Sequence, residues 1–178
     1  MGAAGLIEIK RRLKSVESTR KITKAMGLVA TSKLRKVRNE LANNEKYNEL
    51  CKDIVDVVVS NLPEGYESIY CTERKGDKLY IVLTSDTGLC GGYNNNVIAY
   101  LKEVLDNESG TEKIVLVGSK GLSYMSKYGL STFNQYVSIP DIPTIAEINK
   151  IYNEAIYLYK QGDISEVNIV YTKFISPM

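Results

Sequence analysis

The sequence contains no histidine among its 178 residues. This absence excludes Ser-His-Asp triads, histidine general bases and histidine ligands of a metal ion. The three cysteines, Cys51, Cys71 and Cys90, are spaced by twenty and nineteen residues, which fits neither a zinc site nor a redox Cys-x-x-Cys pair. They are expected to be reduced thiols in a cytosolic setting. We therefore predict no metal site, no cofactor and no histidine-based catalysis in this chain.

Long apolar runs are also missing from the sequence. No stretch reaches the eighteen residues of a membrane span, and the amino terminus has neither the apolar core of a signal peptide nor an Arg-rich transit pattern. The Gly-Lys-Ser/Thr element of a P-loop does not occur. We expect no direct membrane span.

Proline is absent before Pro63, and apolar residues recur there in steps of three and four. This rhythm predicts one long amphipathic coiled-coil helix over residues 1–60, roughly 80 Å in length at 1.5 Å per residue. Gly27 weakens its interior by about 1 kcal/mol. Such a helix needs a second helix along its apolar seam, because isolated helices in water are held mainly by packing. The helix-pairing seam consists of Ile9, Leu13, Val16, Ile22, Met26, Ala30, Leu34, Val37 and Leu41.

Positive charge is concentrated in the same helix. Residues 1–38 hold eleven Lys and Arg and two acids, a net charge of +9, whereas the other 12 of the 23 bases and 19 of the 21 acids give −7. One edge of the helix, which we call the basic edge, carries Lys10, Lys14, Lys21, Lys24 and Arg35. It can be an ordinary solvated face. Nucleic acid or a membrane surface fits less well, because this stretch lacks aromatic residues that stack on bases or anchor in headgroups. An acidic protein partner fits best.

After Pro63 the pattern changes to alternating strands and helices. Strands are predicted at residues 79–84, 113–118, 130–139 and 167–175, and helices at residues 95–105, 121–128 and 144–160. Thr144 and Glu147 form a predicted capping box. The fold class is therefore α/β, with a long N-terminal coiled-coil helix (1–60), a linker (61–77) and a doubly wound, mostly parallel, Rossmann-like sheet domain (78–178).

A glycine-rich turn follows the first predicted strand. In doubly wound folds such a turn often binds a phosphate through backbone N–H groups. Residues 84–96 are therefore a candidate nucleotide site, and the turn at residues 118–121 is a second candidate of the same kind. The spacing is not G-x-G-x-x-G, however, and Asp86 would place negative charge beside the anion. We favour a structural turn in which Ser85 or Asp86 satisfies backbone donors, and we predict no nucleotide binding.

Two motifs carry a family resemblance. The helix segments VESTRKITKAM (16–26) and VATSKLR (29–35), followed by SDTGLCGGYN (85–94), resemble the gamma subunit of F-type ATP synthases along essentially the whole chain. The resemblance implies a rotor: a central-stalk subunit whose N-terminal helix pairs with a C-terminal helix to form a shaft inside a ring of alpha and beta subunits. Because the family continues into that second helix where this sequence stops, we expect a fragment that lacks it.

The resemblance also implies partners and coupling residues. The partners are the alpha and beta subunits, the epsilon subunit, the membrane c-ring and the chain's own missing C-terminal helix, and the location is the cytoplasmic face of the bacterial cell membrane, as a peripheral protein. The rotor would couple ion flow to ATP synthesis or hydrolysis without a catalytic group of its own. Lys24, Met26, Lys33 and Arg35 match the region where the beta subunits push the shaft, and ordinary helix surface is the alternative for each.

Two other classes of function stay open at this stage. One is a small nucleotide-dependent enzyme built on the alternating domain, with the helix as an oligomerisation arm. The other is a coiled-coil adaptor with a globular head, which would self-associate through its seam. The occurrence of both family motifs in one chain favours the rotor.

Overall fold

A computed structural model of the chain describes residues 2–108 and 111–176, with side chains described from residue 5 onward. The chain divides into two compact units, Met1–Glu64 and Gly65–Met178. The first unit is built on a single helix, and the second contains all the strands and the remaining helices of the described ranges.

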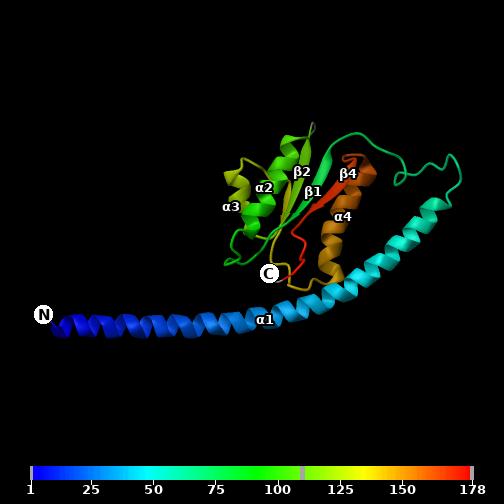
Figure 1. Cartoon of the computed structure of the whole chain (residues 1–178). Helices are drawn as coiled ribbons and strands as arrows, with labels where there is room; N and C mark the ends of the chain where they lie inside the picture. Colours follow the sequence, from blue (N-terminus) through cyan, green and yellow to red (C-terminus); the bar gives the residue numbers. More distant parts are fainter. Residues whose placement is uncertain (1, 109–110, 177–178) are drawn as a thin grey trace. The chain divides into compact units, whose positions relative to one another are not determined.

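The helix of the first unit is α1 (Gly2–Ser60), 59 residues long (Figure 1). It runs through Gly27 without interruption, and the hydroxyl groups of Thr23 and Thr31 donate hydrogen bonds of 2.8 and 2.9 Å to carbonyl oxygens four residues earlier. At its end Asn61 Nδ2 donates to the carbonyl oxygen of Val57 at 2.7 Å, which satisfies one of the carbonyls left open by the last turn. Pro63 then prevents the helix from continuing.

The second unit is a doubly wound parallel sheet, which confirms the predicted fold class. The strands β1 (Lys78–Leu83), β2 (Glu112–Val117), β3 (Asn134–Tyr136) and β4 (Glu166–Val170) lie in the order β3-β2-β1-β4, and every pair is parallel. Helices α2 (Tyr93–Asp106) and α3 (Gly121–Lys127) lie on one face of the sheet, and α4 (Ile145–Gln161) lies on the other (Figure 1).

Each face of the sheet has its own apolar core. Tyr80 and Val82 of β1 point toward α2 and α3, where they pack with Ile98, Leu101 and Met125. The alternate residues of β1 point toward α4 and pack with Ala155, Leu158 and Ile164. This alternation follows from the two-residue period of a strand, and it buries four of the six residues of β1, as many as in β2.

Two predicted strands are shorter in the structure. The strand expected over residues 167–175 ends at Val170, because its neighbour β1 ends at Leu83 and Val82 is the last residue paired with it. The strand expected over residues 130–139 is confined to Asn134–Tyr136, because only the last three residues of β2 pair with it. The capping box is confirmed: Glu147 Oε2 accepts hydrogen bonds from the backbone N–H and the hydroxyl of Thr144, at 2.6 and 2.8 Å.

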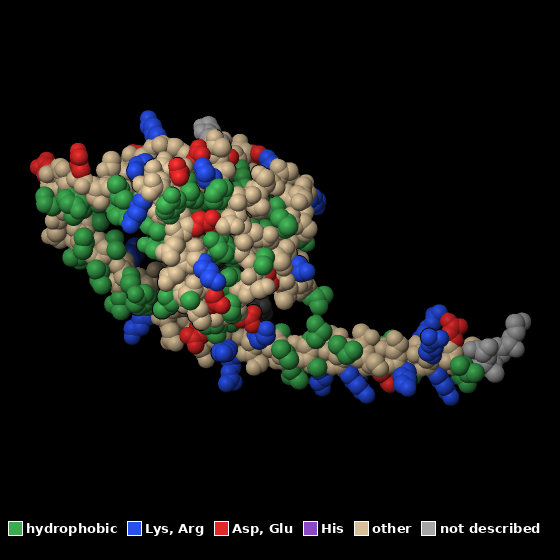
Figure 2. Space-filling view, turned by 180° about the vertical axis from the view of Figure 1, so that it is seen from behind, with side chains coloured by type: hydrophobic (Ala, Val, Ile, Leu, Met, Phe, Trp, Pro, Cys, Tyr) green, Lys and Arg blue, Asp and Glu red, His purple; other side chains and the backbone are tan. Residues whose placement is uncertain are grey.

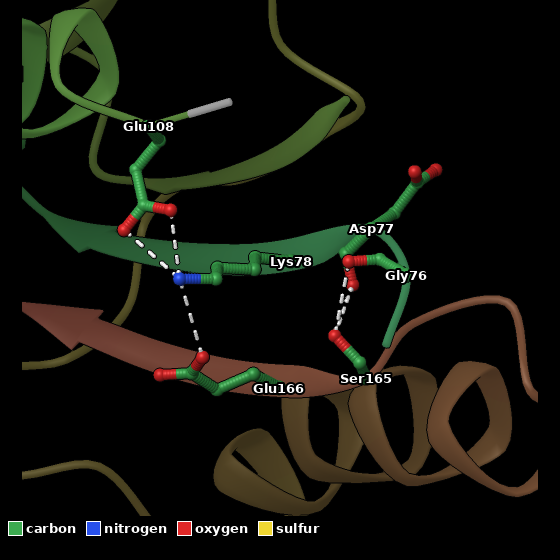
Figure 3. Close-up of polar contacts among 6 residues, drawn as sticks. All are labelled: Gly76, Asp77, Lys78, Glu108, Ser165 and Glu166. Atoms are coloured by element: carbon green, nitrogen blue, oxygen red, sulfur yellow. Dashed lines mark hydrogen bonds and ion pairs between the residues drawn. The ribbon is translucent and has the colours of Figure 1, made fainter. Parts of the chain in front are cut away.

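The amino-terminal edge of the sheet is held by a set of polar contacts (Figure 3). Lys78 Nζ donates to both carboxylate oxygens of Glu108, at 2.8 and 2.9 Å, and lies 3.5 Å from a carboxylate oxygen of Glu166. Ser165 Oγ donates to the carbonyl oxygens of Gly76 and Asp77, at 3.0 and 3.1 Å. These contacts join β1, β4 and the end of α2, so the loops at the opposite, carboxyl edge extend from a fixed sheet.

Candidate functional site

The predicted seam of α1 is exposed along its length. Its large apolar side chains, from Ile9 to Leu41, are between 36% and 65% exposed, and Ala30 is exposed as well. Neither apolar core of the described chain contains a residue of α1. Figure 2 shows apolar side chains and the side chains of Lys and Arg close together along the amino-terminal part of this helix. A helix with this surface cannot be stabilised by its own packing.

The four predicted coupling residues do not share one face of α1. At about 100° per residue, the eleven-residue spacing places Lys24 and Arg35 within about 20° of each other around the helix axis, on the basic edge. The seven-residue spacing likewise places Met26 and Lys33 within about 20° of each other, but about 160° from the first pair. The helix therefore presents two pairs of candidates on nearly opposite faces, and all four side chains are exposed.

The glycine-rich turn after β1 is held by one buried side chain. Asn94 is 3% exposed; its Oδ1 accepts a hydrogen bond from the backbone N–H of Ser85 at 2.9 Å, and its Nδ2 donates to Ser85 Oγ at 2.9 Å. Ser85 Oγ in turn donates to the carbonyl oxygen of Thr87 at 2.7 Å. These bonds fold residues 84–94 back onto the start of α2. Sequence reasoning missed this role of Asn94, and the run of three asparagines at residues 94–96 is the signal that could have indicated it.

The two glycine turns at this edge are bonded to each other. Asp86 Oδ1 accepts the backbone N–H of Ser119 at 2.9 Å, and the backbone N–H of Lys120 donates to the carbonyl oxygen of Ser85 at 2.9 Å. Gly118 has a φ of +98°, and a Cβ there would lie 2.4 Å from the carbonyl oxygen of Thr84. A Cβ on Gly121 would lie 2.6 Å from Thr84 Oγ1. Glycine is therefore required because the turns approach each other closely.

This arrangement accounts for Gly118 and Gly121 without a ligand. The backbone N–H groups of Ser85, Ser119 and Lys120, which could have faced a phosphate, are already bonded within the protein. The sequence analysis predicted a structural turn in which Ser85 or Asp86 accepts hydrogen bonds from backbone N–H groups, and Asp86 does so with Ser119. The expectation that this edge binds no nucleotide stays a prediction.

Two other kinds of feature are absent from the described residues. No group of three or more Cys, Asp and Glu side chains is arranged to hold a metal ion in residues 2–108 and 111–176. None of the helices in those ranges has the length and apolarity that crossing a membrane requires.

Comparison of the sequence with known proteins identifies the family of this chain. Residues 5–178 match the family model described as ATP synthase. The ATP synthase gamma chain of Clostridium botulinum (strain Eklund 17B / Type B) is 53% identical over 179 residues, which cover 100% of this chain and 63% of that relative. The ATP synthase gamma chain of Clostridium beijerinckii is 50% identical over 177 residues, which cover 99% of this chain and 62% of that relative. The chain thus spans slightly less than two thirds of the length of these relatives.

Among solved structures, the chain is similar to one from the rotor of Euglena gracilis mitochondrial ATP synthase, with a TM-score of 0.45 and 19% identity over 80% of this chain and 58% of that one. The family assignment depends instead on the match that begins at residue 5 and continues to residue 178, which includes both motifs noted in the sequence. By that match and by its similarity to the two Clostridium gamma chains, this chain belongs to the ATP synthase gamma chain family.

Proposed function

We propose that this chain is part of the central stalk, or rotor, of an F-type ATP synthase. The observation that carries the proposal is α1: a member of the gamma chain family has a helix of 59 residues with an uncovered apolar seam and a basic edge. In this proposal the seam pairs with a second helix from the part of the gamma chain that the 178 residues do not span. The pair of helices forms a shaft.

The positive charge of the basic edge favours acidic surfaces on the subunits that surround this shaft. Residues 1–38 carry a net charge of +9, and exposed charges of this density attract acidic surfaces over about 8 to 10 Å at physiological salt. We propose that Lys24 and Arg35 contact acidic loops of the surrounding alpha and beta subunits. Met26 and Lys33, on the other side, contact the second helix or the apolar sleeve around the shaft.

The chain contributes asymmetry to the complex, and catalysis takes place in other subunits. A shaft with one basic side presents different surfaces to ring subunits that are otherwise equivalent, and so biases each toward a different affinity for ADP, phosphate or ATP. We further propose that the α/β unit lies near the epsilon subunit and the membrane c-ring, as a peripheral component at the cytoplasmic face of the bacterial membrane. There it couples ion flow to ATP synthesis or hydrolysis.

The experiment uses a chimera in which these 178 residues replace the matched stretch of the C. botulinum gamma chain. Assembled with alpha and beta subunits, epsilon and the membrane sector, the chimera should support ATP hydrolysis and ion pumping. Replacing Lys24 and Arg35 together with Gln should reduce pumping per ATP hydrolysed while assembly is kept, because each exposed pair is worth only about 0.2 to 1 kcal/mol. The defect should diminish as salt is raised.

The matched control removes the same charge from the α/β unit, with Lys127→Gln and Lys160→Gln, and should leave coupling unchanged. Lys33→Gln tests the opposite side of α1 and should affect coupling less than the Lys24 and Arg35 pair. A chimera that does not co-purify with alpha and beta subunits, although it is folded, would exclude the rotor. Normal coupling at every salt concentration in the double variant would exclude Lys24 and Arg35 from the mechanism.

A further inference from the structure

The linker between α1 and β1 is attached to the second unit at two points. Next to β1, Ser165 Oγ donates hydrogen bonds to the carbonyl oxygens of Gly76 and Asp77, and the backbone N–H of Ser165 also donates to that of Asp77, at 2.8 Å (Figure 3). Nearer to α1, residues 69–74 contact Tyr159 in the last turn of α4. The first point is enough to fix the start of β1, so the contacts with Tyr159 need a separate explanation.

Three different contacts converge on Tyr159. Its backbone carbonyl oxygen accepts a hydrogen bond of 2.6 Å from Arg74 Nη1, its hydroxyl donates one of 2.6 Å to the carbonyl oxygen of Ile69, and its ring stacks on Tyr70 with 6.1 Å between the ring centres. We call these contacts the Tyr159 anchor. Ile69 and Tyr70 are 39% and 60% exposed, so apolar burial contributes little to the anchor. The anchor therefore acts mainly by fixing the path of the backbone.

The position of Tyr159 is itself fixed by the way in which α4 ends. The N–H group of Gly162 donates to the carbonyl oxygen of Tyr159 at 3.2 Å, and Gly162 has the left-handed conformation (φ +85°) that often ends a helix. Leu158 and Ile164, which flank this turn, are 8% and 1% exposed and belong to the core on the α4 side. The anchor thus attaches the linker to a well-packed part of the second unit.

The anchor shortens the part of the linker that is free to move. With the anchor, residues 61–68 lie between the end of α1 and Ile69, a free length of eight residues. Without it, the free length extends to residue 75, next to Gly76, and becomes fifteen residues. A flexible linker has a root-mean-square length of about 5.5 Å times the square root of its residue number, which gives roughly 16 Å for eight residues and roughly 21 Å for fifteen. The effective concentration of one unit around the other is therefore about 2.5-fold higher with the anchor.

We propose that Arg74 is a positioning residue that limits how far α1 and the α/β unit can move independently of each other. Arg74 supplies the charge-assisted hydrogen bond of the anchor, and such bonds are roughly twice as strong as neutral ones. With the anchor closed, either unit can turn through a smaller range before the linker transmits the movement to the other. The consequence for coupling rests on the proposed rotor function: a short free linker transmits rotation between α1 and the α/β unit with less loss.

The first test measures distances between two spin labels in the 178-residue chain by pulsed electron paramagnetic resonance. The native cysteines are replaced with Ser, and the labels are attached to Ser60→Cys at the end of α1 and Asn153→Cys on α4, both at exposed positions. An excess of unlabelled chain restricts the signal to pairs of labels within one molecule. In the double variant Arg74→Ala with Tyr159→Phe, the distribution of distances should be about 1.4-fold wider than with the anchor intact.

The matched control makes the same two chemical changes at exposed neighbouring positions. Lys75→Ala with Tyr157→Phe should leave the width of the distribution unchanged. Arg74→Lys keeps the positive charge but not the planar guanidinium group, and it should give an intermediate width.

A second pair of labels shows whether the linker has left α4. Cys71 lies within residues 69–74, so a label on this native cysteine and a label on Asn153→Cys should move apart in the double variant. An unchanged distance between Cys71 and residue 153 would overturn the proposal, because the anchor would not hold the linker. An increase in that distance without a wider distribution between residues 60 and 153 would also overturn it, because the anchor would not limit the movement of α1.

The role in coupling is tested with the same double variant in the C. botulinum chimera. The rate of ATP hydrolysis should be kept, because catalysis takes place in other subunits, whereas the number of ions pumped per ATP should fall. The Lys75 and Tyr157 control should pump normally. Normal pumping by a double variant with a widened distance distribution would overturn the role in coupling. A chimera that does not pump even with Arg74 and Tyr159 intact would reject the rotor and the role in coupling together, and the label distances would still decide whether Arg74 limits independent movement.

Discussion

The guanidinium group of Arg74 donates a hydrogen bond of 2.6 Å to the backbone carbonyl oxygen of Tyr159 and lies 5.0 Å from the centre of its ring. This carbonyl belongs to the last turn of α4, where a positive charge is favoured by the helix dipole. The Tyr159 hydroxyl donates to the carbonyl oxygen of Ile69 at 2.6 Å, and its ring stacks on Tyr70. These contacts hold the segment from Ile69 to Arg74 against α4. Only residues 61–68 lie between the end of α1 and Ile69, the first residue of this segment.

Replacing Arg74 with Ala should loosen this fastened segment. The change removes a charge-assisted hydrogen bond and a cation–π contact, which together are worth about 1 to 2 kcal/mol at a half-buried site. Hydrogen exchange should accelerate at Cys71 and Thr72, whose N–H groups bond to the carbonyl oxygen of Ser68. Arg74→Lys should give an intermediate result, and Lys75→Ala, at the exposed neighbouring position, should give none. Unchanged exchange in Arg74→Ala would show that the contact does not hold the segment.

The sequence predicted the elements whose signals are local. Short apolar runs located the strands of the second unit and 3.6-residue periods located its helices, since both signals lie within a few residues. The Thr144 and Glu147 capping box was predicted for the same reason, because its two partners are three residues apart. The seam and basic edge of α1 also follow from spacing alone.

The contacts that the sequence did not predict connect distant residues. Arg74 and Tyr159 are 85 positions apart, and Lys78 and Glu108 are 30 apart. Nothing in the local pattern distinguishes Arg74 or Lys78 from a solvated surface residue, because their partners are fixed only when the sheet forms. The carboxyl ends of β3 and β4 were predicted too late for a related reason: an edge strand ends near the point where its neighbour ends, and its own sequence does not record that point.

Alanine at Gly118 should be among the most destabilising substitutions in the second unit. Its Cβ would overlap the backbone of Thr84, which cannot move aside, and the residue would keep a positive φ. We expect a loss of more than about 2 kcal/mol in urea unfolding. Gly88→Ala is the control, because a Cβ there meets nothing within 4 Å, and it should change stability by less than about 0.5 kcal/mol. Similar losses for the two variants would contradict the close approach of the turns.

Nucleotides should leave the thermal stability of the chain unchanged. ATP, ADP or NAD bound at the glycine turns at 100 times its dissociation constant would add about 2.7 kcal/mol, an effect that a melting curve detects easily. Because backbone donors of Ser85, Ser119 and Lys120 are already used, we expect no shift at millimolar concentrations. A saturable shift that disappears when Gly91 and Gly92 are replaced would favour a nucleotide-dependent enzyme instead.

The capping box should make stability depend on acid pH. Hydrogen bonds from the backbone N–H and hydroxyl of Thr144 lower the pKa of Glu147 below its usual value of 4.5. A carboxyl group whose pKa is lower in the folded state stabilises the protein above its unfolded pKa, and this contribution is lost as the pH falls through the folded value. The wild type should therefore be more stable than Glu147→Gln at pH 6, and the difference should shrink as the pH falls below 4.5 and through the lowered pKa of the folded state.

Denaturant midpoints measured from neutral to acid pH would test this dependence. Thr144→Ala removes one of the two donors, so introducing Glu147→Gln into that background should produce a smaller pH-dependent change in stability than it does in the wild type. A difference that stays constant across the whole pH range would mean that the charge of Glu147 does not contribute.

The uncovered seam of α1 should make the 178-residue chain associate with itself. Burying each large seam residue is worth on the order of 1 to 2 kcal/mol, and two copies can bury their seams against each other. The helix content measured by circular dichroism should therefore rise with protein concentration, together with the mass measured by sedimentation. At low concentration α1 should fray, because a single helix in water is marginal.

Two double variants would locate this association on the helix. Leu13→Glu with Leu34→Glu places charge in the seam and should abolish the rise in mass and in helix content. Lys24→Gln with Arg35→Gln changes the basic edge on the opposite side and should leave both intact, or strengthen them slightly by removing repulsion between like charges. A monomer with fully formed α1 at every concentration would mean that the seam does not need a partner, and the case for a paired shaft would lose its physical basis.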